Sequence, residues 1–335
     1  MKRLLFVFNP HAGKGMIKAN LCDIVNIFTK GGYEVTVYPT QAPQDGMKKI
    51  ISDGDRFNVV VVSGGDGTLS EGVNAIMRMR TKVPLGYIPA GSTNDFASSM
   101  DIPKNMLKAA KAIVDGVTYD YDIGEFNEKY FVYVAAFGAF TDVSYETSQT
   151  FKNRFGHMAY IAEGIKRLHT YSGINVAVEH DGGSIEGSFI LGMISNSTSI
   201  GGMKRLIPSG VCFDDGLFEV TLVKTPQGPL ALQSLLREAA LNKLSEKNFV
   251  TLRTSHLKIR TASNVAWTLD GEAGGKHNKV EIFNRKQAIS FIVRPDEKTA
   301  EQHMINALAA DKGIYLPSEH EMTENTPEEV HEVRS

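Results

Sequence analysis

A carboxylate stands among glycines directly after a run of four valines. Asp66 lies within Gly64–Thr68, which has the sequence Gly-Gly-Asp-Gly-Thr and follows the valine run Val59–Val62. Four consecutive valines predict a strand buried on both faces, and the apolar spacing from Leu69 to Arg80 predicts a helix. Glycines in such a turn let the backbone approach a ligand, and the free N–H groups of the helix start favour an anion. This geometry suits a phosphate chain, with a metal ion or a hydroxyl between the phosphates and Asp66.

This turn matches neither of two commoner phosphate-binding fingerprints. A dinucleotide fingerprint would need glycine where Ser70 stands. A Walker A loop needs Gly-Lys followed by Ser or Thr, whereas Gly13 and Lys14 are followed by Gly15. A plain tight turn of an α/β protein remains the alternative.

Two further polar turns contain glycine. Asn9–Gly15 follows an apolar segment and precedes a helical pattern, so it too can cradle phosphate, although a plain strand-to-helix turn explains it equally well. Pro89–Phe96 offers the hydroxyl of Thr93, the amide of Asn94 and the carboxylate of Asp95. The alternative for this second turn is a helix cap formed by Asn94 or Asp95.

Paired carboxylates occur at two turns of the second half. Asp270 and Glu272 flank Gly271 at the end of an apolar segment, and Asp214 and Asp215 precede another. Asp-Gly is a frequent hairpin turn, which explains both sites without any chemistry. A cation site is the alternative for the aspartate pair, because carboxylate and carbonyl oxygens suit magnesium or calcium.

Composition restricts the class of protein. The chain has 335 residues, 42% of them hydrophobic, and a net charge of −2, which suits a globular protein of two domains and gives no sign of nucleic-acid binding. The two cysteines, Cys22 and Cys212, predict no disulfide framework and fit a reducing cytosol. No segment approaches the roughly 18 apolar residues of a membrane span, so any membrane contact is expected to be peripheral.

The first part of the chain alternates strand and helix patterns. This alternation predicts a doubly wound parallel sheet with helices on both faces, and ligands bind such sheets at the carboxyl ends of the strands. Strands are expected at Leu4–Phe8, Glu34–Tyr38, Val59–Val62 and Leu85–Ile88, and helices at Met16–Lys30, Met47–Ser52, Leu69–Arg80 and Lys104–Asp115.

After a boundary near residues 122–128, alternating β-branched segments predict an antiparallel sandwich or barrel. Helical patterns occur at His157–His169 and Pro229–Leu244, a closing helix is expected at Pro295–Ala309, and Pro317–Ser335 is expected to be a disordered acidic tail. Strands are expected at Tyr130–Val134, Ile174–Glu179, Phe189–Ser195, Phe218–Val223, Leu257–Thr261, Val265–Leu269, Val280–Phe283 and Ala288–Val293.

Taken together, these motifs resemble the diacylglycerol kinase catalytic-domain family, most closely the soluble bacterial lipid kinases. The Gly-Gly-Asp-Gly-Thr element is shared with NAD kinases and phosphofructokinases, whereas Gly91–Phe96 and Asp270–Glu272 make the resemblance specific. The motifs follow the family's order and spacing from residue 9 to about residue 295: Asn9 and Pro10 with Gly13, Gly64–Thr68, Gly91–Phe96, Asp214–Gly216 and Leu269–Glu272.

The resemblance implies an α/β nucleotide-binding domain followed by an antiparallel β-sandwich domain, with the active site in the cleft between them. The corresponding divisions are residues 1–125 for the ATP-binding domain and 126–294 for the sandwich. A C-terminal helix at 295–312 is expected to pack back on the first domain, and the tail follows at 313–335.

The resemblance also assigns roles to individual residues. Asp66 and Asp95 are expected to organise the catalytic Mg²⁺ and the phosphates, and Glu272 to act as the base, with Asp270 close by as a further catalytic residue. A structural Mg²⁺ is expected on the Asp215 side chain and the carbonyls of Cys212 and Leu217. ATP binding is implied for Asn9, Pro10, His11, Ala12, Gly13, Thr40, Gly64, Gly65, Asp66, Gly67, Thr68, Leu69, Ser70, Glu71 and Thr93.

The expected reaction is transfer of the ATP γ-phosphoryl group to the hydroxyl of diacylglycerol, which gives phosphatidate. A sphingoid base or another long-chain lipid is the alternative acceptor, and NAD is disfavoured by Asn94–Phe96. A regulator that binds nucleotide or lipid without turnover is the alternative of another class. The retention of Asp66, Asp95 and Glu272 argues against such a regulator.

The expected location is cytoplasmic, with peripheral contact at the inner membrane face, and a homodimer is kept as an alternative to a monomer. Within His157–His169, an apolar stripe beside basic residues suggests an interfacial helix, although a core-packing helix is the more ordinary interpretation. The stripe consists of Met158, Ile161, Ile165 and Leu168.

Overall fold

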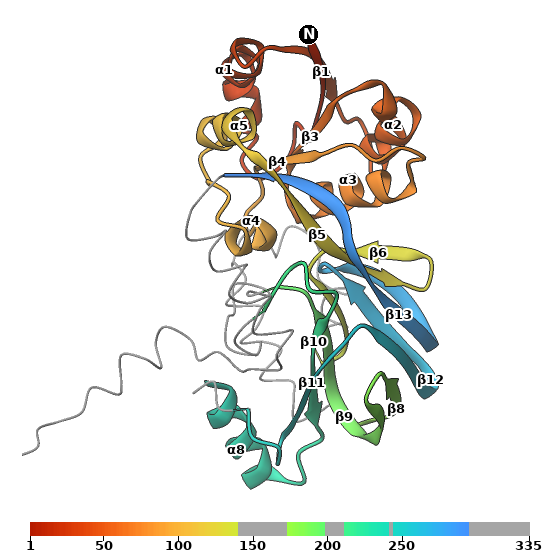
Figure 1. Cartoon of the computed structure of the whole chain (residues 1–335). Helices are drawn as coiled ribbons and strands as arrows, with labels where there is room; N and C mark the ends of the chain where they lie inside the picture. Colours follow the sequence, from red (N-terminus) through yellow and green to blue (C-terminus); the bar gives the residue numbers. More distant parts are fainter. Residues whose placement is uncertain (140–172, 198–210, 241–243, 295–335) are drawn as a thin grey trace, which may run out of the picture.

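The computed structural model describes residues 1–139, 173–197, 211–240 and 244–294 (Figure 1). The predictions for His157–His169, Pro295–Ala309 and Pro317–Ser335 lie outside the described residues. Within them the chain forms two lobes: an N-terminal lobe built on strands β1 to β4 and a C-terminal lobe built on strands β5 to β13.

The N-terminal lobe is a parallel sheet in the order β4-β3-β1-β2, with helices on both faces. Alternate residues of β1 point to opposite faces: Leu4 and Phe6 pack with α1 and α5, whereas Leu5 and Val7 pack with α2 and α3. This arrangement confirms the predicted doubly wound sheet. The strands are β1 (Lys2–Phe8), β2 (Tyr33–Pro39), β3 (Val59–Gly64) and β4 (Leu85–Pro89), and the helices α1 (Ile17–Lys30), α2 (Asp45–Asp53), α3 (Asp66–Arg78), α4 (Asp95–Ser99) and α5 (Met106–Asp115), with a 3-10 turn at Gly54–Arg56.

The C-terminal lobe is antiparallel and encloses its own apolar core. Trp267 lies at the centre of that core, with ring centroids 4.8 Å from Phe137 and 5.0 Å from Phe126. This lobe confirms the predicted β-sandwich. Its elements are β5 (Val117–Phe126), β6 (Lys129–Phe131), β7 (Val134–Gly138), β8 (Ile174–His180), β9 (Gly183–Ser195), β10 (Phe218–Lys224), α8 (Pro229–Ala240), β11 (Phe249–Thr254), β12 (His256–Leu269) and β13 (Glu272–Val293).

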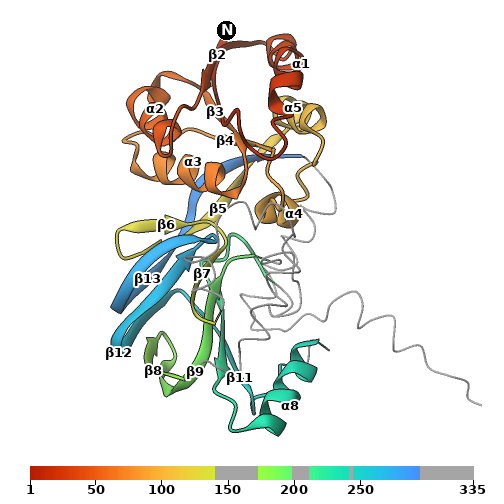
Figure 2. The ribbon, with the colours of Figure 1, turned by 180° about the vertical axis from the view of Figure 1, so that it is seen from behind.

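Strand β13 joins the two lobes into one sheet, as Figures 1 and 2 show from opposite sides. Its first part pairs with β12, and it then pairs with β5 as far as Val293. Near its end Phe291 pairs in parallel with Leu85 of β4. The Phe291 ring lies 4.6 Å from that of Phe96 on α4, so the two lobes share one apolar seam.

The structure differs from the sequence predictions at several elements. Two predicted pairs of strands are each one long strand, β12 and β13, because bulges interrupt the side-chain alternation without ending the strand. The predicted strand Tyr130–Val134 is split between β6 and β7, and β5 was not predicted at all. Helix α3 begins at Asp66, three residues before the predicted start at Leu69, because the periodic pattern is apolar only from Leu69 onward.

Candidate active site

The carboxyl ends of β1, β3 and β4 bring the three predicted glycine turns into backbone contact. Asn9 N donates to Ser63 O at 2.9 Å, and Ala90 N donates to Gly64 O at 2.8 Å. A Cβ added to Gly91 would lie 2.6 Å from Gly65 Cα, closer than any real contact allows. The third turn can therefore approach the second this closely only because residue 91 is glycine, whereas a Cβ on Gly65 would make an ordinary contact of 3.5 Å with Gly91 Cα.

Gly13 has a similar role in the first turn. Its φ is +54°, and a Cβ there would lie 2.3 Å from Ala90 O. Asn9 shapes the turn by accepting a hydrogen bond from His11 N at 2.9 Å through its side-chain oxygen. Pro10 and Ala12 lie in the same turn, whose backbone therefore packs directly on the segment after β4.

Asn94 fixes the segment after β4 from within. Its side chain accepts from Gly91 N at 3.0 Å and donates to Gly91 O at 2.8 Å, while the Tyr87 hydroxyl lies 3.1 Å from its Oδ1. The backbone of Asn94 is left-handed, with φ 55°, and its side chain makes no cap bond to α4. The helix-cap interpretation of Asn94 is therefore wrong, because its amide closes a loop with Gly91 and makes no hydrogen bond to the start of α4. The nearby Thr93 also lies in this loop.

Asp66 meets this loop from α3. Its Oδ2 accepts a hydrogen bond from Asn94 N at 3.0 Å, while its Oδ1 is buried and has no hydrogen-bond partner within the described part of the chain. Burial, followed by the nearby charge of Asp95 and then that of Asp270, raises the pKa of Asp66 to about 7. A buried carboxylate with an unused oxygen, beside two other carboxylates, suits a cation.

Glu272 reaches the same place from the C-terminal lobe. Strands β12 and β13 are joined at Asp270 and Gly271, both with positive φ (51° and 80°), as in a two-residue hairpin turn. Glu272 Oε1 lies 3.5 Å from the position of a Cβ built on Gly67. The hairpin interpretation is therefore correct, and this hairpin presents Glu272 to the glycine turn after β3.

Thr40 and Glu71 form the other border of this region. A Cβ on Gly46 would lie 3.2 Å from Thr40 Cγ2 and 3.8 Å from Glu71 Oε2, so Gly46 lets the two side chains approach. Burial, opposed by the hydrogen bond from Gln44 N and supplemented by the charges of Asp45 and Glu272, raises the pKa of Glu71. Because the charge of Glu272 helps to raise the pKa of Glu71, the side chains of Glu71 and Glu272 lie beside the same turn.

The remaining predicted nucleotide residues on α3 differ in what they offer. Thr68 packs its side chain against Gly64, where a Cβ would lie 2.1 Å from Thr68 Oγ1. Leu69 is fully buried, so only its backbone can face a ligand. The side chain of Ser70 lowers the pKa of the Asp270 carboxyl, which burial raises.

The residues predicted to hold a structural Mg²⁺ lie at a different turn, before β10. Asp215 Oδ1 accepts from Leu217 N at 2.9 Å, and its Oδ2 pairs with Arg253. The thiol of Cys212 donates to Asp214 Oδ1 at 2.9 Å. Protein groups therefore contact both oxygens of Asp215, and the structural Mg²⁺ on Asp215 and on the carbonyls of Cys212 and Leu217 stays a prediction.

Sequence reasoning missed two buried tyrosines that shape the site. Tyr87 donates toward Gly64 O and Asn94 Oδ1, each 3.1 Å away, and Tyr133 donates to the carbonyl oxygen of Asp270 at 3.0 Å. Tyr87 carries the only polar side chain of β4, which was a signal that could have marked it. Tyr133 was predicted to lie within one continuous strand, Tyr130–Val134. In the structure it lies between β6 and β7, where its backbone N–H contacts Asp270.

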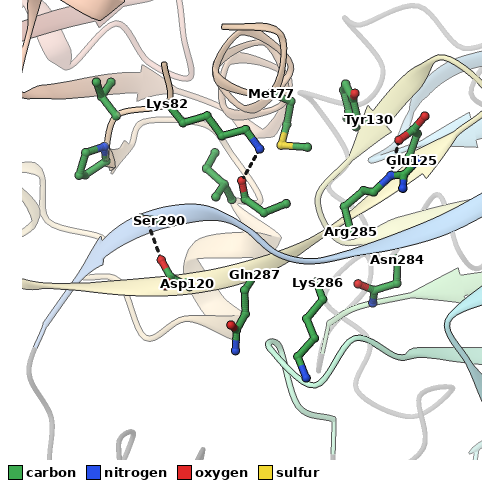
Figure 3. Close-up of a pocket in the computed structure, with 14 residues that line it drawn as sticks. Met77, Lys82, Asp120, Glu125, Tyr130, Asn284, Arg285, Lys286, Gln287 and Ser290 are labelled. Atoms are coloured by element: carbon green, nitrogen blue, oxygen red, sulfur yellow. Dashed lines mark hydrogen bonds and ion pairs between the residues drawn. The ribbon is translucent and has the colours of Figure 1, made fainter. Parts of the chain in front are cut away.

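A surface hollow of about 1030 Å³ lies elsewhere, along β13 where it crosses the N-terminal lobe (Figure 3). None of its lining residues belongs to the predicted site. Its charged groups are largely engaged: Arg285 pairs with Glu125, Ser290 donates to Asp120, and Lys82 Nζ donates to Ala288 O at 2.8 Å. The carboxylates, and not this hollow, define the candidate site.

The described residues hold no three His, Cys, Asp or Glu side chains placed to bind a metal ion together. Among the same residues, no helix is long and apolar enough to cross a membrane.

Comparison with known proteins identifies the family of the chain. A family model described as "Diacylglycerol kinase catalytic domain" matches residues 3–126, and one described as "YegS C-terminal NAD kinase beta sandwich-like domain" matches residues 135–289. A diacylglycerol kinase of Bacillus subtilis is 30% identical over 308 residues, covering 90% of this chain and 99% of its own length. One of Staphylococcus carnosus is 31% identical over 305 residues, covering 90% of this chain and 98% of its own.

Solved structures show the same fold. A crystal structure titled as a putative diacylglycerol kinase from Bacillus anthracis matches with a TM-score of 0.77 and 24% identity, over 88% of this chain and 96% of that one. The chain therefore belongs to the diacylglycerol kinase catalytic-domain family. It is a lipid kinase, and a kinase of this family uses ATP.

Proposed function

We propose that this protein transfers the γ-phosphoryl group of ATP to the hydroxyl of diacylglycerol, giving phosphatidate. The observation that carries the proposal is the approach of Glu272 Oε1 to within 3.5 Å of a Cβ position on Gly67. One lobe thereby supplies a base and the other a phosphate-binding turn. The relatives named diacylglycerol kinase support the choice of acceptor.

Three glycine turns are proposed to hold the phosphates of ATP. Phosphoryl transfer depends mainly on positioning and on neutralising charge, and backbone N–H groups at a helix start do both. The first turn of α3 begins at Asp66, and Gly13 and Gly91 hold the flanking turns against it. Thr40 and Glu71 are proposed to border the nucleotide.

Mg²⁺ is proposed to bind through Asp66, directly or through water, with Asp95 nearby. Bound there, it would neutralise charge on the phosphates. The unused, buried Oδ1 of Asp66 supports this assignment. The raised pKa of Asp66, about 7, follows from burial and from Asp95, and a bound cation would lower it.

Glu272 is proposed to accept the proton of the lipid hydroxyl. The carboxylate is exposed, so an acceptor can reach it, and it lies beside the turn that holds the phosphates. An alcohol is a weak acid, so its proton must be removed as the new P–O bond forms. General-base assistance of this kind contributes about 10²–10⁴-fold.

The proposal is tested by following ADP release and labelled lipid product with diacylglycerol, a sphingoid base or no lipid in detergent micelles. We expect ATP consumption that depends on diacylglycerol. Faster turnover with the sphingoid base would identify that base, and not diacylglycerol, as the acceptor. Nucleotide binding without lipid-dependent turnover would favour a regulator that binds nucleotide or lipid without catalysis.

Replacement of Glu272 by Gln tests the base. We expect turnover to fall about 10²–10⁴-fold while nucleotide affinity is kept, because the amide cannot accept the proton. Glu281→Gln is the matched control, since Glu281 lies on the same strand and pairs with His256 and Lys258 at the surface. Turnover of Glu272→Gln within a factor of about two of the Glu281→Gln rate would remove Glu272 from the role.

A further inference from the structure

Asp270 lies two residues before the proposed base, and protein donors surround its carboxylate. Val132 N donates to Oδ2 at 2.7 Å, and Tyr133 N and Val134 N donate to Oδ1 at 2.9 and 3.1 Å. An ionised carboxylate has about four acceptor sites, and protein N–H groups use three of those of Asp270, with at least one on each oxygen.

The backbone of Asp270 is held as firmly as its side chain. Asp270 N donates to Val134 O at 2.9 Å, and the Tyr133 hydroxyl donates to the carbonyl oxygen of Asp270 at 3.0 Å. The residue is 3% exposed and adopts a left-handed backbone conformation, with φ 51°. The segment Val132–Val134 therefore determines where the hairpin after Asp270 begins.

The segment that holds Asp270 is tied to the other lobe through α3. Ser70, whose side chain lowers the pKa of Asp270, lies one turn beyond Asp66 on that helix. One turn further, Asn74 donates to Tyr130 O at 2.9 Å and accepts from Tyr130 N at 3.3 Å. The helix that begins with the phosphate-binding turn is thus fixed to the segment that holds Asp270.

We propose that Asp270 is a positioning residue, which holds the hairpin that carries Glu272 at a fixed distance from the phosphate-binding turn and does not itself accept the proton of the alcohol. The inference rests on the proposed function for the role of Glu272. The sequence-based prediction made Asp270 a catalytic residue, whereas here Asp270 positions the hairpin that carries Glu272.

The rival interpretation makes Asp270 a second proton acceptor. Such a group needs a free oxygen facing the substrate, whereas both oxygens of Asp270 accept protein hydrogen bonds. Burial raises the pKa of Asp270 to about 6, and the donors at Tyr133, Val132 and Val134 oppose that rise. These donors hold the ionised form in place as a structural anion.

Asp270→Asn distinguishes the two interpretations. Asparagine tolerates a left-handed backbone, and its amide oxygen can still accept from Tyr133 and Val134. Its NH₂ group then faces the N–H of Val132, where two donors repel, so the hairpin should loosen without unfolding the protein. Asp101→Asn is the matched control, because Asp101 is exposed and also left-handed, with φ 49°.

The first measurement needs no turnover. Amide hydrogen exchange at Val132–Val134 should be about tenfold faster in Asp270→Asn than in wild type, and unchanged in Asp101→Asn. Exchange that is unchanged in Asp270→Asn would overturn the inference. This readout remains decisive even if the wild-type protein phosphorylates no lipid, a result that would refute the proposed function alone.

The second measurement is a double-mutant cycle on turnover. If Asp270 acts through Glu272, Asp270→Asn should lower kcat about 10–100-fold, leave nucleotide affinity within about twofold, and have no further effect in the Glu272→Gln protein. Losses that multiply would show that Asp270 contributes independently and would overturn the inference. A wild-type kcat in Asp270→Asn would overturn it as well.

Discussion

Asp66 shows how a residue that is proposed to bind a cation can oppose folding. Its pKa rises from 3.8 to about 7 in the folded protein, first through burial and then through the charge of Asp95. The folded state therefore binds a proton that the unfolded state releases between these values. Stability falls as the pH rises through this window, because the folded state must then hold a buried charge.

Replacing Asp66 by Asn should therefore stabilise the protein and stop its activity. Above pH 7, without divalent cations, we expect the free energy of unfolding to rise by about 2–4 kcal/mol, and the gain should vanish near pH 4. Urea unfolding at both pH values measures this difference, with turnover assayed in parallel. An equal gain at both pH values would exclude the buried charge as its cause.

Two glycines of the first turn allow a sharper comparison. Both have positive φ, but a Cβ on Gly13 would lie 2.3 Å from Ala90 O, whereas one on Gly15 would have no neighbour closer than 3.7 Å. Gly15→Ala should cost only the left-handed backbone penalty, about 1–2 kcal/mol.

Gly13→Ala should lose more, because the first turn must move away from the third. We expect a further loss of about 1–3 kcal/mol and a fall of about tenfold or more in nucleotide affinity, measured by titration. Equal effects of the two substitutions would show that the contact with Ala90 O does not shape the site.

At the scale of single residues, the sequence predicted the residues of the candidate site but not all of their hydrogen-bond partners. The glycine turns follow from local residue types and short spacings, whereas the role of Glu272 follows from the resemblance to the family. The tie between Asp270 and Val132–Val134 joins positions that are more than 130 residues apart in the chain. No local pattern encodes such a pairing, so the role of Asp270 was assigned from its neighbour.

Among the elements, α3 connects the lobes. Asn74 matches the backbone of Tyr130 as a neighbouring strand would, with one donor and one acceptor. The sequence predicted that Asn74 lies on a helix. It did not predict that Asn74 contacts β6, because polar residues on a helix normally face solvent.

Asn74→Ala should release α3 from β6. We expect a loss of about 1–3 kcal/mol in the free energy of unfolding, because both backbone groups of Tyr130 lose their partner, together with a lower kcat. Asn20→Ala is the control, since Asn20 on α1 donates to Met16 O within its own helix and to Met106 Sδ. Its free energy of unfolding should change by no more than about 0.5 kcal/mol.

The long strands show where element prediction stops. The alternation in β12 and β13 breaks at bulges, between Arg260 and Val265 and between Arg285 and Ile289, and the sequence pattern was interpreted as separate strands. Strand β5 escaped prediction because Asp120 and Asp122 interrupt its apolar character. Its alternating tyrosines, Tyr119 and Tyr121, were the available signal.

For the whole molecule, β13 makes the lobes interdependent. It pairs with β5 and, through Phe291, with β4, so the last strand of the C-terminal lobe completes the sheet of the N-terminal one. The composition and the alternating patterns predicted both fold classes correctly. They could not predict a shared strand, since that depends on contacts between the two ends of the chain.

A fragment of residues 1–126 should therefore lack a cooperative unfolding transition. Without Phe291, which is 1% exposed in the full chain, α4 and β5 lose their apolar partner. Fusing residues 280–294 through a flexible linker should restore the transition, as followed by circular dichroism during urea unfolding. Cooperative unfolding of the unfused fragment would contradict this interdependence.

Because β13 ends at Val293, the ribosome must make most of the chain before the nucleotide-binding sheet can close. A nascent or truncated polypeptide that already contains every glycine turn would still lack its last strand. Synthesis that stops early should therefore yield no species able to consume nucleotide away from its acceptor.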